Sequence, residues 1–371
     1  MKYVDEFRDP ELTAHLLHEL TAATTRPFRV MEVCGTHTMA IFRSGLRALL
    51  PSQIELISGP GCPVCVTSAS HIDAFLQMAE LPDTHLAVFG DLFRVPGSNG
   101  VTLAHARARG AKIEVVYSAV DGLELARQNP AELVIFPGIG FETTTPGIAA
   151  TILAARQQNI DNFMVFSTHK TMLPPLMALL DDPALGIDGL LCPGHVSSII
   201  GAAAYQPLAE QYDLACVVAG FEPTDILQAL ILMARQISEG RAEVENAYTR
   251  AVTWEGNARA RAMVATIFAP ADMSWRGLGL IAGSGLAIRE EYAGFDAQSR
   301  LALTVPESKE PPGCLCGEIL KGIIAPPACP LFGSRCTPSS PIGPCMVSSE
   351  GTCSAWFSYS GETRSATAIT N

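Results

Sequence analysis

The sequence lacks an excess of positive charge, a long apolar run and an apolar start, and each absence excludes a class of protein. Its 25 basic residues are outnumbered by 37 acidic residues, which gives a net charge of −12. We therefore expect no basic face for nucleic acid or for an anionic membrane. No apolar stretch reaches the length of about 18 residues that a membrane-spanning helix needs. The first residues, MKYVDEFRDPE, contain no apolar signal core, so we expect a cytoplasmic protein.

Hydrophobic residues are abundant, and they recur in a regular order. They make up 48% of the 371 residues, which argues against global disorder. Apolar, strand-like runs are each followed by a Gly- or Pro-rich loop and then by a helix-like stretch, as in IELISGPGCPVC, ELVIFPGIGFETT and LACVVAGFEPTD. This order is typical of α/β folds with parallel sheets. Ligands bind in such folds at the carboxyl ends of the strands, where these loops lie.

The chain length and composition suggest three parts. We expect two parallel-sheet, Rossmann-like α/β domains around a cleft, at residues 1–125 and 126–305. A polar, proline-rich stretch, VPESKEPPG, then leads into a loop-rich region at 306–371 that contains six of the 11 cysteines. This last region has too few large apolar residues for a core of its own, so a covalent link or a metal must hold it together.

Two of the expected loops carry possible metal ligands or redox thiols. The first, CGTHT, places Cys34 and His37 at C-x-x-H spacing. The second, GPGCPVC, places Cys62 and Cys65 at C-x-x-C spacing, where a helix N-terminus would stabilise a thiolate. These four residues could form a Cys3His zinc site. Alternatively, Cys62 and Cys65 could be a redox dithiol, and the spacing alone leaves both readings open.

Six cysteines near the end of the chain form the strongest pattern. They have a single close C-x-C pair and no second knuckle of the kind that structural zinc sites use, which favours an iron–sulfur cluster over zinc. A cubane cluster needs four thiolates, so two cysteines would be left to form a dithiol. The six are Cys314, Cys316, Cys329, Cys336, Cys345 and Cys353.

These motifs together resemble one known family. CGTHT, GPGCPVCVT, FGDLFRVPG, GFETT, CPGHVSSIIG and PIGPCMVSSEGTC are similar to the motifs of the hydrogenase maturation factor HypD family, and the resemblance runs from about residue 30 to residue 356. It implies a scaffold on which an iron ion acquires two cyanides and one carbon monoxide, the Fe(CN)2CO group of nickel–iron hydrogenases. HypC is the implied small partner and HypE the implied cyanide donor.

The resemblance also implies a role for individual residues. Cys34 would bind the iron ion, with His37 beside it, and Cys62 with Cys65 would be a redox-active pair. Of the C-terminal cysteines, Cys316 and Cys345 would form a dithiol. A [4Fe–4S] cluster would be held by Cys314, Cys329, Cys336 and Cys353.

Polar residues in three further loops are candidates for binding the cyanide nitrogens. They follow apolar strands, and hydroxyl and imidazole groups at one sheet edge can donate hydrogen bonds to a common ligand. Their alternative role is ordinary helix capping or packing. The candidates are Thr143, Thr144, His169, His195 and Ser197. Two other functions stay open at this point, a stand-alone thiol–disulfide oxidoreductase and a zinc-stabilised binding module.

Overall fold

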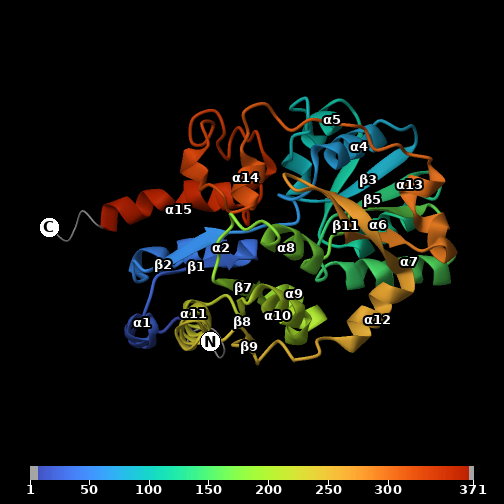
Figure 1. Ribbon diagram of the computed structural model, residues 1–371. Helices are drawn as coiled ribbons and strands as arrows, with labels where there is room; N and C mark the ends of the chain where they lie inside the picture. Colours follow the sequence, from blue (N-terminus) through green and yellow to red (C-terminus); the bar gives the residue numbers. More distant parts are fainter. Residues whose placement is uncertain (1–6, 367–371) are drawn as a thin grey trace.

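Two parallel sheets form the framework of the protein (Figure 1). The computed structural model describes residues 7–366, with side chains described up to residue 360. The first sheet has the order β2-β1-β7-β8-β9 and the second has the order β4-β3-β5-β6, with every neighbouring pair parallel. The first sheet consists of β1 (Phe28–Glu32), β2 (Ile54–Ser58), β7 (Gly189–Pro193), β8 (Ala215–Ala219) and β9 (Val244–Asn246). The second consists of β3 (Thr84–Phe89), β4 (Lys112–Val116), β5 (Leu133–Gly138) and β6 (Phe163–Ser167).

The expected α/β class with two parallel sheets is confirmed. The segments of the chain that form each sheet differ from those expected. The expected division at residue 125 falls between β4 and β5, which belong to the same sheet. The second sheet is built from one continuous stretch, whereas the first combines strands from before and after it. The second sheet is therefore an insertion between β2 and β7 of the first.

Helices cover both sheets. In the sequence, a β-hairpin lies between the last strand of the sheets and the C-terminal region. The antiparallel hairpin pairs β10 (Phe268–Trp275) with β11 (Gly279–Ile288). The longer helices are α1 (Pro10–Ala23), α2 (Gly35–Arg43), α4 (Ala69–Ala79), α6 (Ala119–Gln128), α7 (Thr145–Gln157), α8 (Leu173–Leu180), α11 (Pro223–Glu239), α12 (Ala258–Ile267) and α15 (Thr352–Ala366). The shorter ones are α3 (Leu46–Leu49), α5 (Leu103–Ala108), α9 (Gly194–Ile200), α10 (Gln206–Tyr212), α13 (Ala297–Arg300) and α14 (Cys316–Leu320).

Burial explains why the strand sequences are almost continuously apolar. Strands β7 and β8 are buried at every position, as expected for central strands of a parallel sheet covered on both faces. One core cluster lies between the first sheet and α1 and α11, and another lies between the second sheet and α6 and α7. The largest cluster includes residues of both sheets and of the C-terminal cysteine loops, so the three parts share one core.

The C-terminal region lies above the first sheet in Figure 1, where α15 packs against α2. The ring of Trp356 lies 5.1 Å from that of Phe42, and the guanidinium of Arg47 lies over both rings. These contacts fix the last helix to the helix that begins immediately after Cys34.

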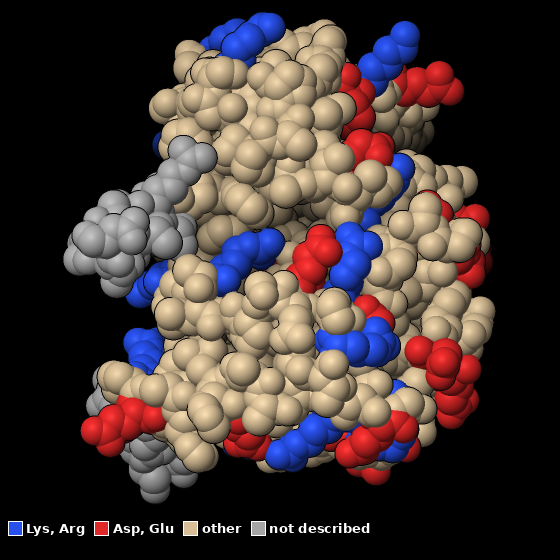
Figure 2. All heavy atoms as spheres, turned by 60° about the vertical axis from the view of Figure 1, so that its left-hand side comes forward, with Lys and Arg blue, Asp and Glu red and all other residues tan. Residues whose placement is uncertain are grey.

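Charged side chains of both signs are interspersed on the face shown in Figure 2. Uncharged residues cover most of the upper half of this face. Among the helices of residues 7–366, none combines the length and apolar content needed to cross a bilayer.

His169 provides a test of this packing. It is fully buried, and its Nδ1 lies 2.9 Å from the hydroxyl oxygen of Ser167. Burial, and secondarily the charge of Lys170, lowers the pKa of His169 to about 3, whereas an unfolded histidine has a pKa of about 6.5. Between these values only the unfolded chain gains the proton, so the free energy of unfolding must fall as the pH drops below 6.5, by up to about 1.4 kcal/mol per pH unit for this residue.

We expect His169→Gln to weaken this pH dependence. Urea unfolding of both proteins between pH 7 and pH 5 measures it. Parallel losses of stability in the two proteins would contradict the assignment.

Candidate functional site

The loops CGTHT and GPGCPVC, 25 residues apart in the sequence, lie backbone against backbone. The N–H of Gly35 donates to the carbonyl oxygen of Gly61 over 3.1 Å, and the N–H of Gly59 donates to that of Glu32 over 2.9 Å. A Cβ atom on Gly61 would lie 2.4 Å from the Cα of Cys34. Only glycine fits at position 61, and this close approach brings the first two cysteine motifs together.

Cys34 lies at the carboxyl end of β1 and is the N-cap residue of α2. Burial raises the pKa of its thiol to about 11, and the carboxylate of Glu350 adds to that effect. The Thr36 hydroxyl and the N–H groups at the start of the helix act in the opposite direction. The thiol is therefore protonated at neutral pH, and a metal ion that binds it must displace the proton.

Glu350 comes from the C-terminal region and completes the surroundings of Cys34. Its carboxylate oxygen Oε1 accepts a hydrogen bond of 2.6 Å from the hydroxyl of Thr36. Its backbone is so close to Gly35 that a Cβ there would lie 2.3 Å from the Glu350 carbonyl oxygen. Glu350 also lines a cavity of about 330 Å³ together with Val64, Gly90 and Thr144. This cavity lies where the GPGCPVC loop, the ends of β3 and β5 and the C-terminal region meet.

The rings of two histidines pack against Phe221 beside this site, with His195 stacked and His37 tilted. The ring centroids of His37 and His195 lie 4.7 Å and 4.0 Å from that of Phe221. His37 is buried, and its Nε2 lies 2.9 Å from the carbonyl oxygen of Gly220, which can only accept. Burial lowers the pKa of His37 to about 4. The neutral ring therefore carries its proton on Nε2, and Nδ1 keeps a lone pair for which residues 7–366 offer no hydrogen-bond donor.

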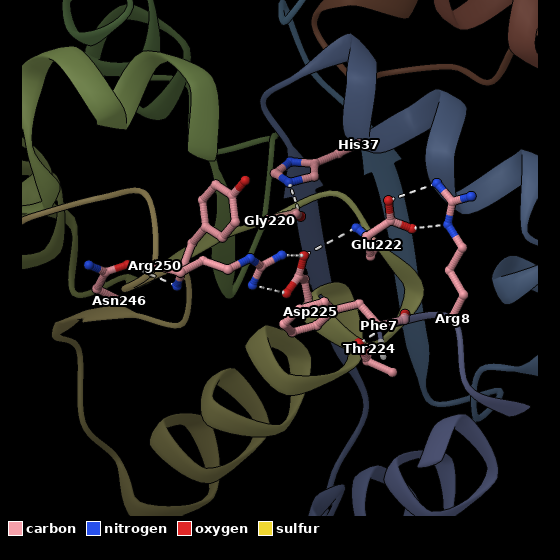
Figure 3. A network of polar contacts seen from close by, with 10 residues as sticks. Phe7, Arg8, His37, Gly220, Glu222, Thr224, Asp225, Asn246 and Arg250 are labelled. Atoms are coloured by element: carbon pink, nitrogen blue, oxygen red, sulfur yellow. Dashed lines mark hydrogen bonds and ion pairs between the residues drawn. The ribbon is translucent and has the colours of Figure 1, made fainter. Parts of the chain in front are cut away.

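A polar network holds the turn that carries Gly220 and Phe221 (Figure 3). Asp225 is fully buried and accepts two hydrogen bonds, of 2.6 Å and 2.5 Å, from the guanidinium of Arg250. Arg8 binds Glu222 in the same two-pronged way, at 2.5 Å and 2.8 Å. Arginine–carboxylate pairs of this geometry restrict both partners. The turn that contacts His37 is thus fixed from both sides.

The thiols of the second cysteine loop continue into the C-terminal region. The N–H of Cys65 lies 3.3 Å from the sulfur of Cys62, and the side chain of Cys65 contacts that of Cys345. The sulfur of Cys345 lies 2.9 Å from that of Cys316. The resulting order of contacts is Cys62, Cys65, Cys345, Cys316, and we call these four residues the thiol line.

The remaining four C-terminal cysteines suit a cubane cluster in number and chemistry. Cys314 contacts Cys316, and Cys336 lies within electrostatic reach of Cys314 and Cys353. A Cβ on Gly343 would lie 2.9 Å from the sulfur of Cys314, so a side chain at position 343 would crowd this thiol. Cys329 is buried in the same region. Within residues 7–366, no three histidine, cysteine or carboxylate side chains are placed to hold a single metal ion, whereas a cube takes four separate thiolates around its corners.

The candidates for binding cyanide nitrogens divide into two groups. Thr143 and His195 are exposed, and Thr144 lines the cavity beside Glu350. His169 and Ser197 are fully buried. The hydroxyl of Ser197 donates to the carbonyl oxygen of Pro193 and lies 3.1 Å from the hydroxyl of Tyr205, so these two candidates belong to the packing beneath the strand ends.

Glu350 is the site residue that the sequence did not indicate. It lies in SSEGTC, between Cys345 and Cys353, and no sequence motif marks it as a site residue. A carboxylate in a loop is usually exposed, and only the packing of the C-terminal region onto α2 brings this one to Cys34.

The charge of Glu350 leads to a prediction about Cys34. Glu350→Gln removes a negative charge beside the thiol and should lower its pKa, so at pH 8 alkylation of Cys34 should be several-fold faster because the thiolate is the reacting form. Thr36→Val removes a hydrogen-bond donor and should slow the same reaction. Mass spectrometry of the peptide that contains Cys34 measures both rates. Equal rates in wild type and Glu350→Gln would show that the carboxylate does not influence the thiol.

Comparisons with known proteins show the family of the chain. The family model HypD, described as "Hydrogenase formation hypA family", matches residues 11–360. The chain is 46% identical over 368 residues to hydrogenase maturation factor HypD2 of Bradyrhizobium diazoefficiens, with 97% of each chain covered. It is 44% identical over 367 residues to hydrogenase maturation factor HypD of Escherichia coli K12, covering 97% of this chain and 98% of that one. The chain therefore belongs to the HypD family, and its role is in hydrogenase maturation.

Proposed function

We propose that the protein is the scaffold on which the iron ion of a nickel–iron hydrogenase acquires two cyanides and one carbon monoxide, with Cys34 as its iron ligand. HypC would supply a second cysteine, and HypE would deliver the cyanide. The observation that carries this proposal is the position of Cys34, a buried thiol at a strand end that three separate segments of the chain enclose. A single protein thiol leaves the other coordination positions of the iron for a partner and for incoming ligands.

The surroundings of Cys34 suit an electron-rich iron. Soft thiolates bind such a metal well. When the iron approaches, the Cys34 thiol loses its proton, and the nearby carboxylate of Glu350 is placed to receive it. Thr36 holds that carboxylate in position. The N–H groups at the start of α2 then stabilise the bound thiolate.

Polar side chains around the same opening would orient the diatomic ligands. Thr143, Thr144 and His195 lie at the strand ends and can donate hydrogen bonds to cyanide nitrogens. His37 holds Phe221 and His195 in a stack. These residues would bind and orient the ligands, while their supply depends on the partners.

The C-terminal thiols would provide reducing equivalents. We assign Cys314, Cys329, Cys336 and Cys353 to a [4Fe–4S] cluster, which supplies electrons one at a time at low potential when bound. The thiol line gives a path from this region to the neighbourhood of Cys34. The Cys345 thiolate attacks a Cys62–Cys65 disulfide at Cys65. Cys316 then resolves the mixed disulfide, so two thiols are released at Cys62 and Cys65 while Cys316 and Cys345 become oxidised.

Two other functions are weaker alternatives. A stand-alone thiol–disulfide oxidoreductase is favoured by the thiol line, but each of its four residues is buried, so a protein substrate cannot reach them directly. A zinc-stabilised binding module would need Cys34, His37, Cys62 and Cys65 to converge. Within the described residues they are not placed as ligands of one ion. The scaffold also accounts for Glu350 and for the polar residues at the strand ends. We propose that it acts in the cytoplasm.

Infrared spectroscopy of the chain purified anaerobically with HypC tests the iron ligand. Cyanide and carbonyl stretching bands are expected for wild type and should be absent from Cys34→Ala. Cys192→Ala is the matched control, because Cys192 is also buried but bonds to the carbonyl oxygen of Leu190 in the core. Bands of normal intensity in Cys34→Ala would refute the assignment.

A substitution in the thiol line tests whether Cys345 reduces the Cys62–Cys65 pair. Cys345→Ser should leave a Cys62–Cys65 disulfide in protein isolated from cells, because the neighbouring thiol that attacks it is missing. Differential alkylation followed by mass spectrometry measures the oxidised fraction, with Cys216→Ser as control. A fully reduced pair in Cys345→Ser would show that the thiol line is not the path of reduction.

A further inference from the structure

Arg276 is a buried cation between the two groups of redox cysteines. It lies at the end of the β10–β11 hairpin and is 2% exposed. Its backbone N–H donates to the carbonyl oxygen of Val66 over 2.8 Å, and its Nε donates to that of Thr67 over 2.9 Å. The residue is thereby tied to the segment that directly follows Cys65.

On its other side, the hairpin touches the C-x-C loop. Gly277 and Gly317 cross so closely that a Cβ on Gly277 would lie 2.3 Å from the Cα of Gly317. Gly277 also has a φ of +76°, which favours glycine. The residue that follows Arg276 therefore touches the residue that follows Cys316.

The guanidinium of Arg276 is incompletely neutralised. Its Nη1 forms an ion pair with Glu310, whose side chain is 43% exposed. Its Nη2 is buried and has no hydrogen-bond acceptor among residues 7–366. A buried charge with an unsatisfied donor is costly unless another anion compensates it. The sulfurs of Cys314 and Cys316 lie within electrostatic reach of this guanidinium.

Arg276 stays fully charged at neutral pH, in contrast to the buried Lys170. Lys170 is also buried nearby, but burial, together with the charge of Arg276, lowers its pKa to about 7. An arginine side chain stays protonated in proteins. Any anionic sulfur in this region therefore meets a permanent positive charge from Arg276.

We propose that Arg276 is a positioning residue that raises the reduction potential of the sulfur centre held by Cys314 by compensating the negative charge that reduction adds. The inference rests on the proposed function, in which that centre is an iron–sulfur cluster. Reduction by one electron would add one negative charge to the cluster that Cys314, Cys329, Cys336 and Cys353 would hold, and the guanidinium would stabilise that added charge. Net charge and hydrogen bonds to the sulfurs are among the features that set the potential of such clusters.

A redox titration of the full chain, reconstituted anaerobically with iron and sulfide, tests this role. Arg276→Met should make the reduction equilibrium at least tenfold less favourable, which is 59 mV for one electron. Arg276→Lys, which keeps a cationic head group, should lie closer to wild type. Glu310→Gln removes the counter-charge without changing the arginine and should shift the equilibrium in the opposite direction. A purely structural role would reduce the amount of cluster without changing the potential of the cluster that remains.

The outcomes distinguish a failure of the proposed cluster from a failure of the proposed role of Arg276. Wild-type protein that takes up no sulfide would overturn the cluster and this inference with it. If the wild-type protein binds sulfide but the reduction equilibrium constant of Arg276→Met lies within twofold of the wild-type value, only the role of Arg276 would be overturned. If Arg276→Met does not fold, a Glu310→Gln potential that is unchanged or lower would overturn it as well.

Discussion

The contact between the C-terminal region and the ends of the first sheet is the interaction on which the whole site depends. Cys34 follows β1 directly, but its surroundings are complete only when Glu350 packs on Gly35 and bonds to Thr36. The same packing places Cys345 beside Cys65. It also lets the hydroxyl of Ser348 donate to Asp91 at the end of β3 over 2.7 Å. One small region thus touches both sheets and brings Cys34 and the thiol line into a single site.

Burial gives the cysteines of this site a common property. The thiols of Cys34 and Cys65 lie where water does not stabilise a negative charge, so their pKa is raised. For Cys345, contact with Cys316 lowers the pKa, but contacts with Cys353 and Cys65 together with burial raise it overall. Such thiols are unreactive toward casual oxidants and become ligands or nucleophiles only when a cation or a neighbouring sulfur favours the anion. The chain has a net charge of −12. The few positive charges close to these sulfurs therefore strongly influence whether a thiolate can form.

The sequence predicted the fold class, which the structure confirms, but it did not predict which strands pair or which segments lie against the cysteine loops. The α/β order could be recognised because strands such as β7 and β8 are buried on both faces and end in Gly- and Pro-rich loops. Which strands pair cannot be read from local patterns, and the insertion of the second sheet was missed for that reason. Glu350 and Arg276 were missed because their burial arises only from packing between distant segments. His169 and Ser197 followed apolar strands like the other candidates, and the sequence could not show that their side chains lie beneath the surface.

The insertion of the second sheet between β2 and β7 has a consequence for synthesis on the ribosome. Strands β1 and β2 emerge early, but their partner β7 begins 131 residues after the end of β2, at Gly189. At 5–20 residues per second this interval is on the order of 10 s. During that time Cys34, Cys62 and Cys65 are part of a nascent chain in which β7 is still missing, and the region around Glu350 that encloses Cys34 is translated later still. Newly made chains therefore pass through an interval in which these thiols are not yet enclosed, and oxidation during that interval would keep them from forming the site.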